Sequence, residues 1–131
     1  MKRRILIIDD EKKLCTLVST FLEKKGYSAV SAKNGKQGIK AARYSAPALI
    51  LLDINMPKMD GFAVLEKLKA DPRTMSIPVI MLTGRDDEDS KLKAAGLYSE
   101  HYITKPFDLE ELDKKINQLL QILGGATKTQ V

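Results

Sequence analysis

Short apolar runs alternate with helix-like patterns along the chain. The runs are rich in Ile, Leu and Val, and they fall at Arg4–Ile8, Ala29–Ser31, Ala48–Leu52, Val79–Leu82 and Tyr102–Ile103. Continuous apolar runs of this kind are typical of strands that are buried on both faces of a parallel sheet. The alternation of strand and helix, repeated five times, predicts an α/β fold. We expect a single doubly wound (βα)5 domain with helices on both faces of the sheet and right-handed crossovers.

The first and last predicted helices have the clearest patterns. Apolar residues recur at helical spacing at Leu14, Leu17, Val18, Phe21 and Leu22, and again at Leu109, Leu112, Ile116, Leu119, Leu120 and Leu123. Gly26 stands where a left-handed helix end is expected. Asp108 is suited to cap the start of the last helix, and Glu111 lies three residues later, as in a capping box.

Weaker periodicity predicts three further helices. One extends from after Asn34 toward Tyr44, one from near Gly61 to before Pro72, and one over about Asp87–Ala95, ending at Gly96. Residues 124–131 lack periodicity and are expected to form a flexible tail or the start of a linker. Residues 1–123 are therefore predicted to form the domain.

The composition is that of an ordinary globular domain, with 131 residues of which 44% are hydrophobic. No apolar run approaches the roughly 20 residues that cross a bilayer, and the N-terminal run is too short for a signal peptide. We therefore expect a cytoplasmic protein without membrane contact. The net charge is +5, but the basic residues are spread along the chain without interleaved aromatic residues, which disfavours direct nucleic-acid binding. Cys15, the single cysteine, is expected to be a buried thiol.

Polar side chains with useful chemistry follow four of the predicted strands. They are Asp9 and Asp10 after the first run, Asp53 after the third, Thr83 after the fourth and Lys105 after the fifth. Ligands of doubly wound sheets bind beyond the carboxyl ends of the strands, so these side chains are expected to converge. Each residue alone has an ordinary explanation as a turn former, a strand former or a solvated side chain. Their joint occurrence favours a functional site.

The predicted cluster of carboxylates calls for a cation. Neighbouring carboxylates repel each other and raise each other's pKa. Their hard oxygen ligands suit Mg²⁺, which binds one or two carboxylates together with phosphate oxygens. With this ion in place, Lys105 and Thr83 are positioned to contact a phosphoryl group. Asp53 is then the candidate nucleophile for phosphoryl transfer.

Four motifs resemble those of response-regulator receiver domains. They are Asp9-Asp10, Leu52–Gly61, Leu82-Thr83-Gly84 and Tyr102–Phe107, in an order and spacing that extend the similarity over about residues 2–123. The resemblance implies a chemotaxis-regulator-like fold with strands in the order 2-1-3-4-5. It implies that a sensor histidine kinase or phosphotransfer protein phosphorylates the chain, which then switches the surface around the fourth helix, fifth strand and fifth helix. This surface would control a downstream protein target or a C-terminal output domain.

The same resemblance implies a role for each site residue. Asp53 matches the phosphorylated aspartate, and the metal ligands are Asp9, Asp10, Asp53 and the backbone carbonyl of Asn55. Thr83 and Lys105 match the pair that contacts phosphate, and Tyr102 matches the aromatic residue that moves with the switch, although an edge-strand aromatic covering the sheet is the alternative. Lys105-Pro106 matches a cis peptide bond.

One stretch departs from the family's pattern. Gly96 is followed by Leu97–His101, which is about two residues longer than usual and ends in Glu100-His101 where an acidic pair is common. The dimer contacts of relatives therefore cannot be transferred, and a monomer and a phosphorylation-dependent dimer remain open. His101 is expected to be an exposed loop residue without a role, although a pH-responsive contact is an alternative.

Two other functions compete with the signalling switch, which carries out only its own phosphorylation and dephosphorylation and is not otherwise an enzyme. An aspartate-nucleophile phosphatase would also use Mg²⁺, Asp and Lys, but its nucleophile is the first of an Asp-x-Asp pair after the first strand, where this chain has Asp9-Asp10-Glu11. A receiver-like scaffold without phosphorylation is disfavoured because the set of site residues is complete. The output, as a stand-alone adaptor or as part of a longer regulator, is open at this stage.

Overall fold

The computed structural model describes residues 2–84 and 101–124, with side chains up to Gln121. The elements are β1 (Arg4–Ile8), α1 (Lys12–Lys24), β2 (Ser28–Ala32), α2 (Gly35–Ser45), β3 (Leu49–Asp53), α3 (Gly61–Ala70), β4 (Val79–Thr83), β5 (His101–Thr104) and α5 (Leu109–Gly124). The helix predicted over Asp87–Ala95, the longer stretch after Gly96 as far as Glu100, and the predicted tail beyond Gly124 lie outside the described residues.

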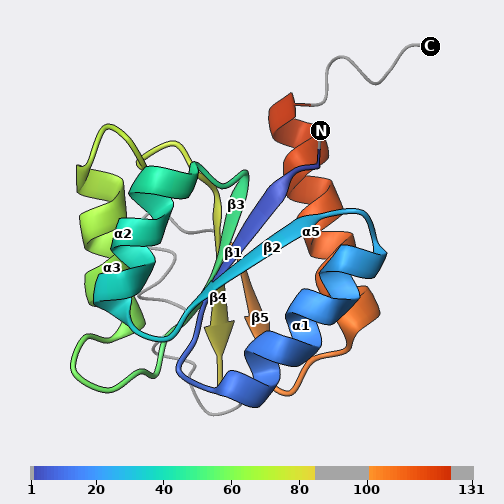
Figure 1. The fold of residues 1–131 in the computed structure, drawn as a ribbon, viewed down its shortest axis with the longest axis horizontal. Helices are drawn as coiled ribbons and strands as arrows, with labels where there is room; N and C mark the ends of the chain where they lie inside the picture. Colours follow the sequence, from blue (N-terminus) through green and yellow to red (C-terminus); the bar gives the residue numbers. More distant parts are fainter. Residues whose placement is uncertain (1, 85–100, 125–131) are drawn as a thin grey trace.

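The strands form one five-stranded parallel sheet in the order β2-β1-β3-β4-β5, which confirms the predicted α/β topology (Figure 1). The register aligns the strand ends, with Ile8 beside Leu52 and Asp53 beside Leu82. Helices α1 and α5 cover one face of the sheet, and α2 and α3 cover the other. The carboxyl ends of all the strands therefore meet along one edge.

Two apolar clusters form the core, one on each face of the sheet. Alternate residues of a strand point to opposite faces. Accordingly, Ile5 and Ile7 lie in the cluster with α1 and α5, while Leu6 and Ile8 lie in the cluster with α2 and α3. Strands β3 and β4 are buried throughout. This burial on both faces explains why the sequence shows continuous apolar runs instead of alternation.

Local caps set the ends of the helices close to their predicted places. The Asn34 side chain accepts a hydrogen bond from the Gln37 backbone N–H at 2.8 Å, and Asp108 accepts one from the Glu110 N–H at 3.0 Å. Gly26 has a φ of 96° just after α1, as expected for a left-handed helix end. None of the described helices is long and apolar enough to span a lipid bilayer.

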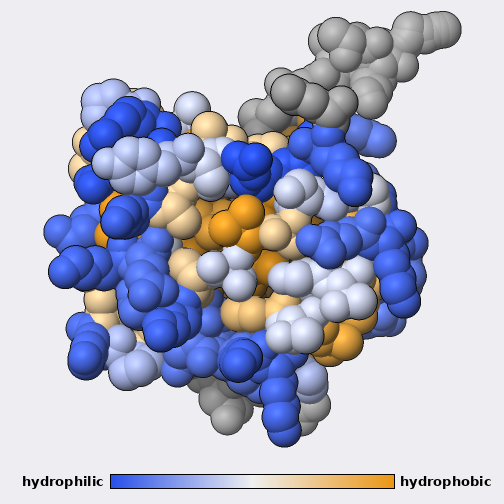
Figure 2. All heavy atoms as spheres, in the orientation of Figure 1, coloured by the Kyte–Doolittle hydropathy of each residue, from blue (hydrophilic) through white to orange (hydrophobic). Residues whose placement is uncertain are grey.

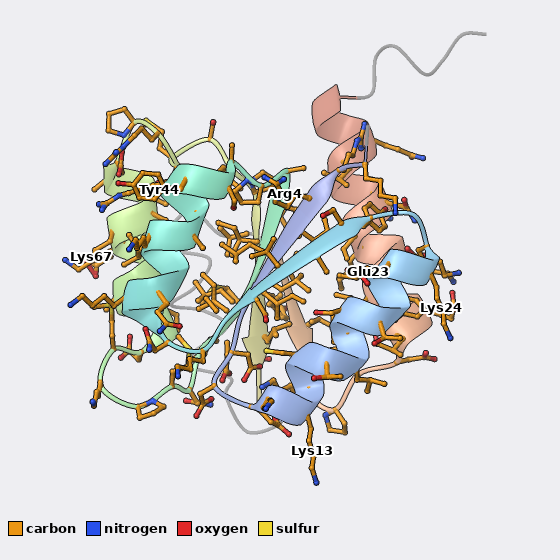
Figure 3. All side chains as sticks on the ribbon, viewed as in Figure 1. Arg4, Lys13, Glu23, Lys24, Tyr44 and Lys67 are labelled. Carbon is orange, nitrogen blue, oxygen red and sulfur yellow. The ribbon has the colours of Figure 1, made fainter. Side chains whose placement is uncertain are left out.

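Charged residues on the helices point away from the sheet. Lys13 and Lys24 on α1 and Lys67 on α3 extend outward in Figure 3. The buried face of α1 instead carries Cys15 and Val18, which confirms the prediction of a buried thiol. The helices thus separate a dry side against the sheet from a solvated outer side.

One sequence prediction is wrong in detail, and one residue of an apolar stripe stays at the surface. Leu17 lies on the apolar stripe of α1, and 55% of this residue is exposed. His101 was expected in an exposed loop, but it is the half-buried first residue of β5 and lies beside Ile80. Strand pairing with β4 lengthens β5 beyond the apolar pair Tyr102–Ile103.

Candidate functional site

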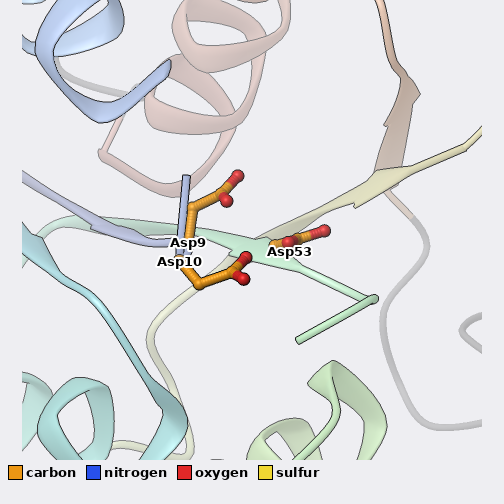
Figure 4. A group of neighbouring side chains, drawn as sticks. All are labelled: Asp9, Asp10 and Asp53. Carbon is orange, nitrogen blue, oxygen red and sulfur yellow. The ribbon is translucent and has the colours of Figure 1, made fainter. Parts of the chain in front are cut away.

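Three carboxylates meet where β1 and β3 end. Asp9 and Asp10 follow β1 directly, and Asp53 is the last residue of the neighbouring strand β3 (Figure 4). One carboxylate oxygen from each residue lies within 4.8 Å of the others. Asp9 and Asp53 are buried, whereas Asp10 is exposed. The structure thus brings together the three acidic side chains that the sequence singled out.

Backbone contacts hold Asp9 in place at the start of α1. Its N–H donates to the Ala32 carbonyl oxygen at 3.1 Å, which extends the β1–β2 ladder by one bond. Its Oδ1 accepts a hydrogen bond from the Glu11 N–H at 2.9 Å. The Cys15 thiol donates to the Asp9 carbonyl oxygen at 3.4 Å. With 1% of the residue exposed, Asp9 has a fixed orientation.

Asp53 is fixed by the loop between β3 and α3. Its Oδ1 accepts a hydrogen bond from the Asn55 N–H at 3.2 Å, and the Gly61 N–H donates to the Ile54 carbonyl oxygen at 2.8 Å. A Cβ at Gly61 would lie 2.4 Å from the Asp53 carbonyl oxygen, so only glycine permits this approach. The loop therefore folds back tightly beneath the Asp53 carboxylate, and Asn55 lies on its exposed side.

Lys105 bridges the two buried carboxylates. Its Nζ lies 2.9 Å from Asp9 Oδ2, 3.5 Å from Asp53 Oδ1 and 4.0 Å from Glu11 Oε1. The Lys105 N–H donates to the Thr83 carbonyl oxygen at 2.6 Å, which attaches the loop after β5 to the end of β4. The Lys105–Pro106 peptide bond is cis. The ammonium group therefore reaches the carboxylates from the loop after β5, the strand at the far end of the sheet from β2.

Thr83 lies at the same edge, but its hydroxyl is turned toward β5. Its Oγ1 is 3.5 Å from the Ile103 carbonyl oxygen and 3.4 Å from Thr104 Oγ1, both long for hydrogen bonds. Tyr102 lies one residue before Ile103 on β5, with 37% of the residue exposed. Sequence reasoning missed Thr104 as a partner of Thr83, although its place directly before Lys105 was a usable signal.

The electrostatics of the cluster favour an added cation. Burial raises the pKa of Asp53 to about 6, with a further contribution from the negative charge of Asp9, while Lys105 and the Asn55 N–H act in the opposite direction. Burial opposes the charge of Lys105, but the hydrogen bond to Asp9 and the charges of Asp53 and Asp9 raise its pKa overall. Among the described residues, the Lys105 ammonium group contacts Asp9 and Asp53, and Asp10 adds a third carboxylate to the cluster. Oxygen ligands with this charge deficit suit a hard divalent cation.

A hollow of about 360 Å³ opens beside the cluster, between the starts of α1 and α2. Its lining comprises Asp9, Asp10, Lys12, Cys15, Ser31, Ala32, Lys33 and Gln37. Burial, aided by the charge of Asp9, raises the pKa of the Cys15 thiol to about 11, so this thiol is a poor nucleophile. Sequence reasoning did not single out Lys12, Lys33 or Gln37, because exposed polar residues at helix starts carry no distinctive signal.

The parallel sheet and the aspartate cluster at its carboxyl edge define a class of α/β domains that receive a ligand or group at that edge. Within this class, the chain matches the family described as response regulator receiver domain over residues 5–117, and it belongs to that family. Domains of this family are in general phospho-acceptor switches of two-component signalling, and they generally bind Mg²⁺ at an acidic pocket.

Individual relatives show how the chain compares in length. It is 42% identical over 118 residues to the DNA-binding dual master transcriptional regulator RpaA of Synechocystis. This alignment covers 90% of this chain and 49% of RpaA. It is 39% identical over 117 residues to protein PilH of Pseudomonas aeruginosa, and this alignment covers 89% of this chain and 97% of PilH. The chain therefore spans about half the length of RpaA and nearly all of PilH.

Solved structures agree with the fold. A CheY-like response regulator receiver domain protein from Methanospirillum hungatei superimposes with a TM-score of 0.84 at 30% identity, covering 92% of this chain and 95% of that chain. The chemotaxis protein CheY4 of Vibrio cholerae gives a TM-score of 0.85 at 25% identity, covering 90% of this chain and 98% of that chain.

Proposed function

We propose that Asp53 accepts a phosphoryl group from a phosphohistidine of a sensor histidine kinase or phosphotransfer protein. The observation that carries this proposal is the arrangement of the buried Asp53 carboxylate beside two further carboxylates and 3.5 Å from the Lys105 ammonium group. An Asp53 carboxylate oxygen forms a bond to phosphorus while the bond between phosphorus and the donor imidazole nitrogen breaks. The imidazole nitrogen keeps the electron pair of that bond and takes up a proton from solvent, so the donor histidine leaves as a neutral base.

The residues fit a Mg²⁺ ion held by Asp9, Asp10, Asp53 and the carbonyl oxygen of Asn55. When bound, the ion would neutralise oxygen charge on the phosphoryl group, which is the main requirement of phosphoryl transfer. The three aspartates offer oxygen ligands within 4.8 Å of one another, and one of them is exposed to solvent and to an entering ion. Asp9 and Asp53 are held by backbone N–H groups, so their oxygens need little rearrangement.

Phosphorylation would be reported through Lys105, Thr83 and Tyr102. A phosphoryl group on Asp53 brings new negative charge next to the Lys105 ammonium group, which contacts it directly. The long hydrogen bonds of Thr83 to β5 are weak, so its hydroxyl can turn toward a phosphoryl oxygen at small cost. Tyr102 then moves into the space beside β5 that the Thr83 hydroxyl leaves, which changes the outer surface of β5.

We propose that the phosphoryl donor docks on an apolar hollow next to the site. This hollow of about 410 Å³ is lined by Glu11, Leu14, Leu17, Lys105, Pro106, Phe107 and Leu109. It shares Lys105 and Glu11 with the surroundings of Asp53, so a protein seated there has its phosphohistidine close to the acceptor. The exposure of Leu17 leaves apolar surface that such a partner would cover.

Residues 1–123 are proposed to act as the receiver unit in the cytoplasm, without turnover of external phosphoesters. The phosphorylated form would control either a separate target protein or a C-terminal output domain. Relatives about twice as long as this chain support the second arrangement, and PilH, which the chain covers almost completely, supports the first.

Mass spectrometry of the intact chain tests the acceptor. Incubation with acetyl phosphate and Mg²⁺ is expected to add one group of about 80 Da, and chelation of Mg²⁺ should prevent the addition. Asp53→Asn is expected to abolish labelling. Asp60→Asn is the matched control, because Asp60 is an exposed cap of α3 in the same loop. Labelling of Asp53→Asn at the wild-type rate would exclude the proposed acceptor, and steady release of phosphate from a phosphoester panel would favour a phosphatase.

A further inference from the structure

Strand β2 leaves one side of its backbone without a strand partner. Among the strands of the described chain, β2 pairs only with β1 (Figure 1). The Ser28 N–H donates to the Arg3 carbonyl oxygen at 2.8 Å, and the Ala32 carbonyl oxygen accepts from Asp9 at 3.1 Å. Residues alternate in direction along a strand, so the N–H and C=O groups of Ala29 and Ser31 point outward. They form a template for one more strand.

Within β2 itself, Ser28–Ala32, the strand has no charged residue and no proline that would block pairing. Outer strands are commonly blunted by charged residues, proline, bulges or a covering element. The sequence of β2 is Ser-Ala-Val-Ser-Ala, with small uncharged side chains, and Ser31 is exposed while Ala29 and Val30 are half-buried. Figure 2 shows a neutral to apolar surface along the region of β2, between hydrophilic flanks. An extended chain can therefore approach the backbone of β2 closely.

The surroundings of β2 account for the positive net charge of the whole protein. Residues 24–52 contain six basic residues and no acidic one, whereas the remaining 16 basic and 17 acidic residues nearly cancel. Lys33 follows β2 directly, and Lys36 and Lys40 are exposed on α2. Of the other basic residues in this stretch, Arg43 is bound to Asp71 at 2.8 Å, and Lys24 and Lys25 lie at the end of α1. Lys33, Lys36 and Lys40 are therefore the cations of this stretch that lie just after β2 and on α2.

A hollow continues the edge at the carboxyl end of β2. The cavity of about 360 Å³ described above is lined by Ser31, Lys33, Lys12 and Gln37 as well as by Asp9 and Asp10. A side chain of an added strand opposite Ser31 would enter this cavity.

We propose that β2 and α2 bind an acidic, extended segment of another protein, which adds to the sheet as a strand beside β2. Main-chain hydrogen bonds to Ala29 and Ser31 would supply affinity, and Lys33, Lys36 and Lys40 would select acidic side chains. A second copy of this chain is a poor occupant, because paired β2 edges would bring two basic surfaces together. This inference does not depend on phosphorylation of Asp53.

Nuclear magnetic resonance of the full ¹⁵N-labelled chain tests the inference. The probe is a synthetic peptide of alternating Glu and Val, compared with a Lys and Val peptide of the same length. We expect the acidic peptide to shift the Ala29 and Ser31 amides most strongly, to slow their hydrogen exchange, and to bind more weakly as salt rises. Equal binding of the Lys peptide, or shifts confined to α2 without slower exchange in β2, would refute strand addition.

Charge-reversal variants distinguish binding at this site from nonspecific electrostatic attraction of the peptide to the whole protein. Lys40→Glu is expected to weaken binding of the acidic peptide about fivefold at low salt, as for loss of one exposed charge pair. Lys114→Glu on α5 makes the same charge change at an exposed position of the opposite face and is expected to leave binding nearly unchanged. Equal losses in both variants would overturn the proposal, as would tighter binding of a single-stranded oligonucleotide than of the peptide.

Discussion

Two aspartates at opposite edges of the sheet, Asp53 and Asp71, are held in opposite ways. Asp53 is buried among like charges, and burial together with Asp9 raises its pKa to about 6. Asp71 follows α3 at the amino edge, where its carboxylate accepts hydrogen bonds from Arg73 and from Arg43 Nε at 2.8 Å. The hydrogen bonds from Arg73 hold the pKa of Asp71 well below its usual range.

The difference shows how the same side chain can serve structure or chemistry. Asp71 pairs with the guanidinium groups of Arg43 and Arg73 and ties the end of α3 to α2. Its negative charge is therefore balanced by the protein itself. Within the described residues, Asp53 shares the Lys105 ammonium group with Asp9, so the negative charge of the two carboxylates exceeds the positive charge beside them. We expect a divalent cation to supply the missing positive charge, which would then also balance the negative charge of a phosphoryl group on Asp53.

The largest expected effect follows loss of Lys105. Lys105→Met removes the ammonium group between Asp9 and Asp53 and the proposed contact to phosphoryl oxygens. Phosphorylation by acetyl phosphate is expected to slow about a hundredfold, the scale seen when a charge-stabilising donor is lost. The initial rate of labelling, followed by mass, provides the measurement. Lys114→Met is the control, and a Lys105→Met rate within a factor of two of wild type would contradict the role.

Removal of charge at Asp53 should stabilise the protein in the absence of Mg²⁺. A raised pKa means that the folded state holds its proton more tightly, so ionisation of Asp53 costs stability progressively as pH rises from about 4 to about 6 and fully above that. Asp53→Asn is therefore expected to raise the free energy of unfolding by about 2 kcal/mol at pH 7.5. Urea unfolding measures this. An unchanged or lower stability would show that Lys105 already compensates the charge.

Mg²⁺ affinity should depend on pH around the pKa of Asp53. Protonated Asp53 is a poor ligand, so the ion and the proton compete. Affinity is expected to be nearly constant above pH 7 and to fall by up to about tenfold per unit below pH 6. Calorimetric titration with MgCl₂ across this range is the measurement. In Asp53→Asn the dependence should be lost in this window, and a persistent slope would assign the proton to another group.

The smallest effect is expected at Asp71, with the opposite sign to Asp53. A lowered pKa means that ionised Asp71 stabilises the folded state above the ordinary carboxyl pKa, and that this contribution is lost as pH falls. Asp71→Asn should lower the thermal midpoint by about a few degrees at pH 7 without changing the rate of Asp53 labelling. A thermal melt monitored by circular dichroism tests this. A raised midpoint would remove the contrast between the two aspartates.

Much of the fold and the site was predictable because the signals are local. Strands β1 and β3 end directly at Asp9 and Asp53, so their apolar runs also locate the carboxylates. Asn34 begins α2 through a contact to its own third neighbour, Gln37. Such features depend on a few adjacent residues, and periodicity or capping patterns are enough to find them.

Other features depend on distant partners and escaped sequence reasoning. Leu17 shares the apolar stripe of α1 but stays largely exposed, which the helical spacing does not reveal. His101 belongs to β5 because β4 pairs with it. Arg43 and Asp71 lie 28 positions apart, and neither residue signals the other along the chain.

The chain's own order of apolar runs and polar ends determined that five parallel strands would bring Asp9, Asp10, Asp53 and Lys105 to one edge, because strand burial and crossover direction follow from local pattern and handedness. Tertiary structure alone decided that Lys105 Nζ lies 2.9 Å from Asp9 and that the Thr83 hydroxyl turns to β5. These outcomes depend on packing between segments far apart in sequence, where small shifts of position choose one polar partner over another.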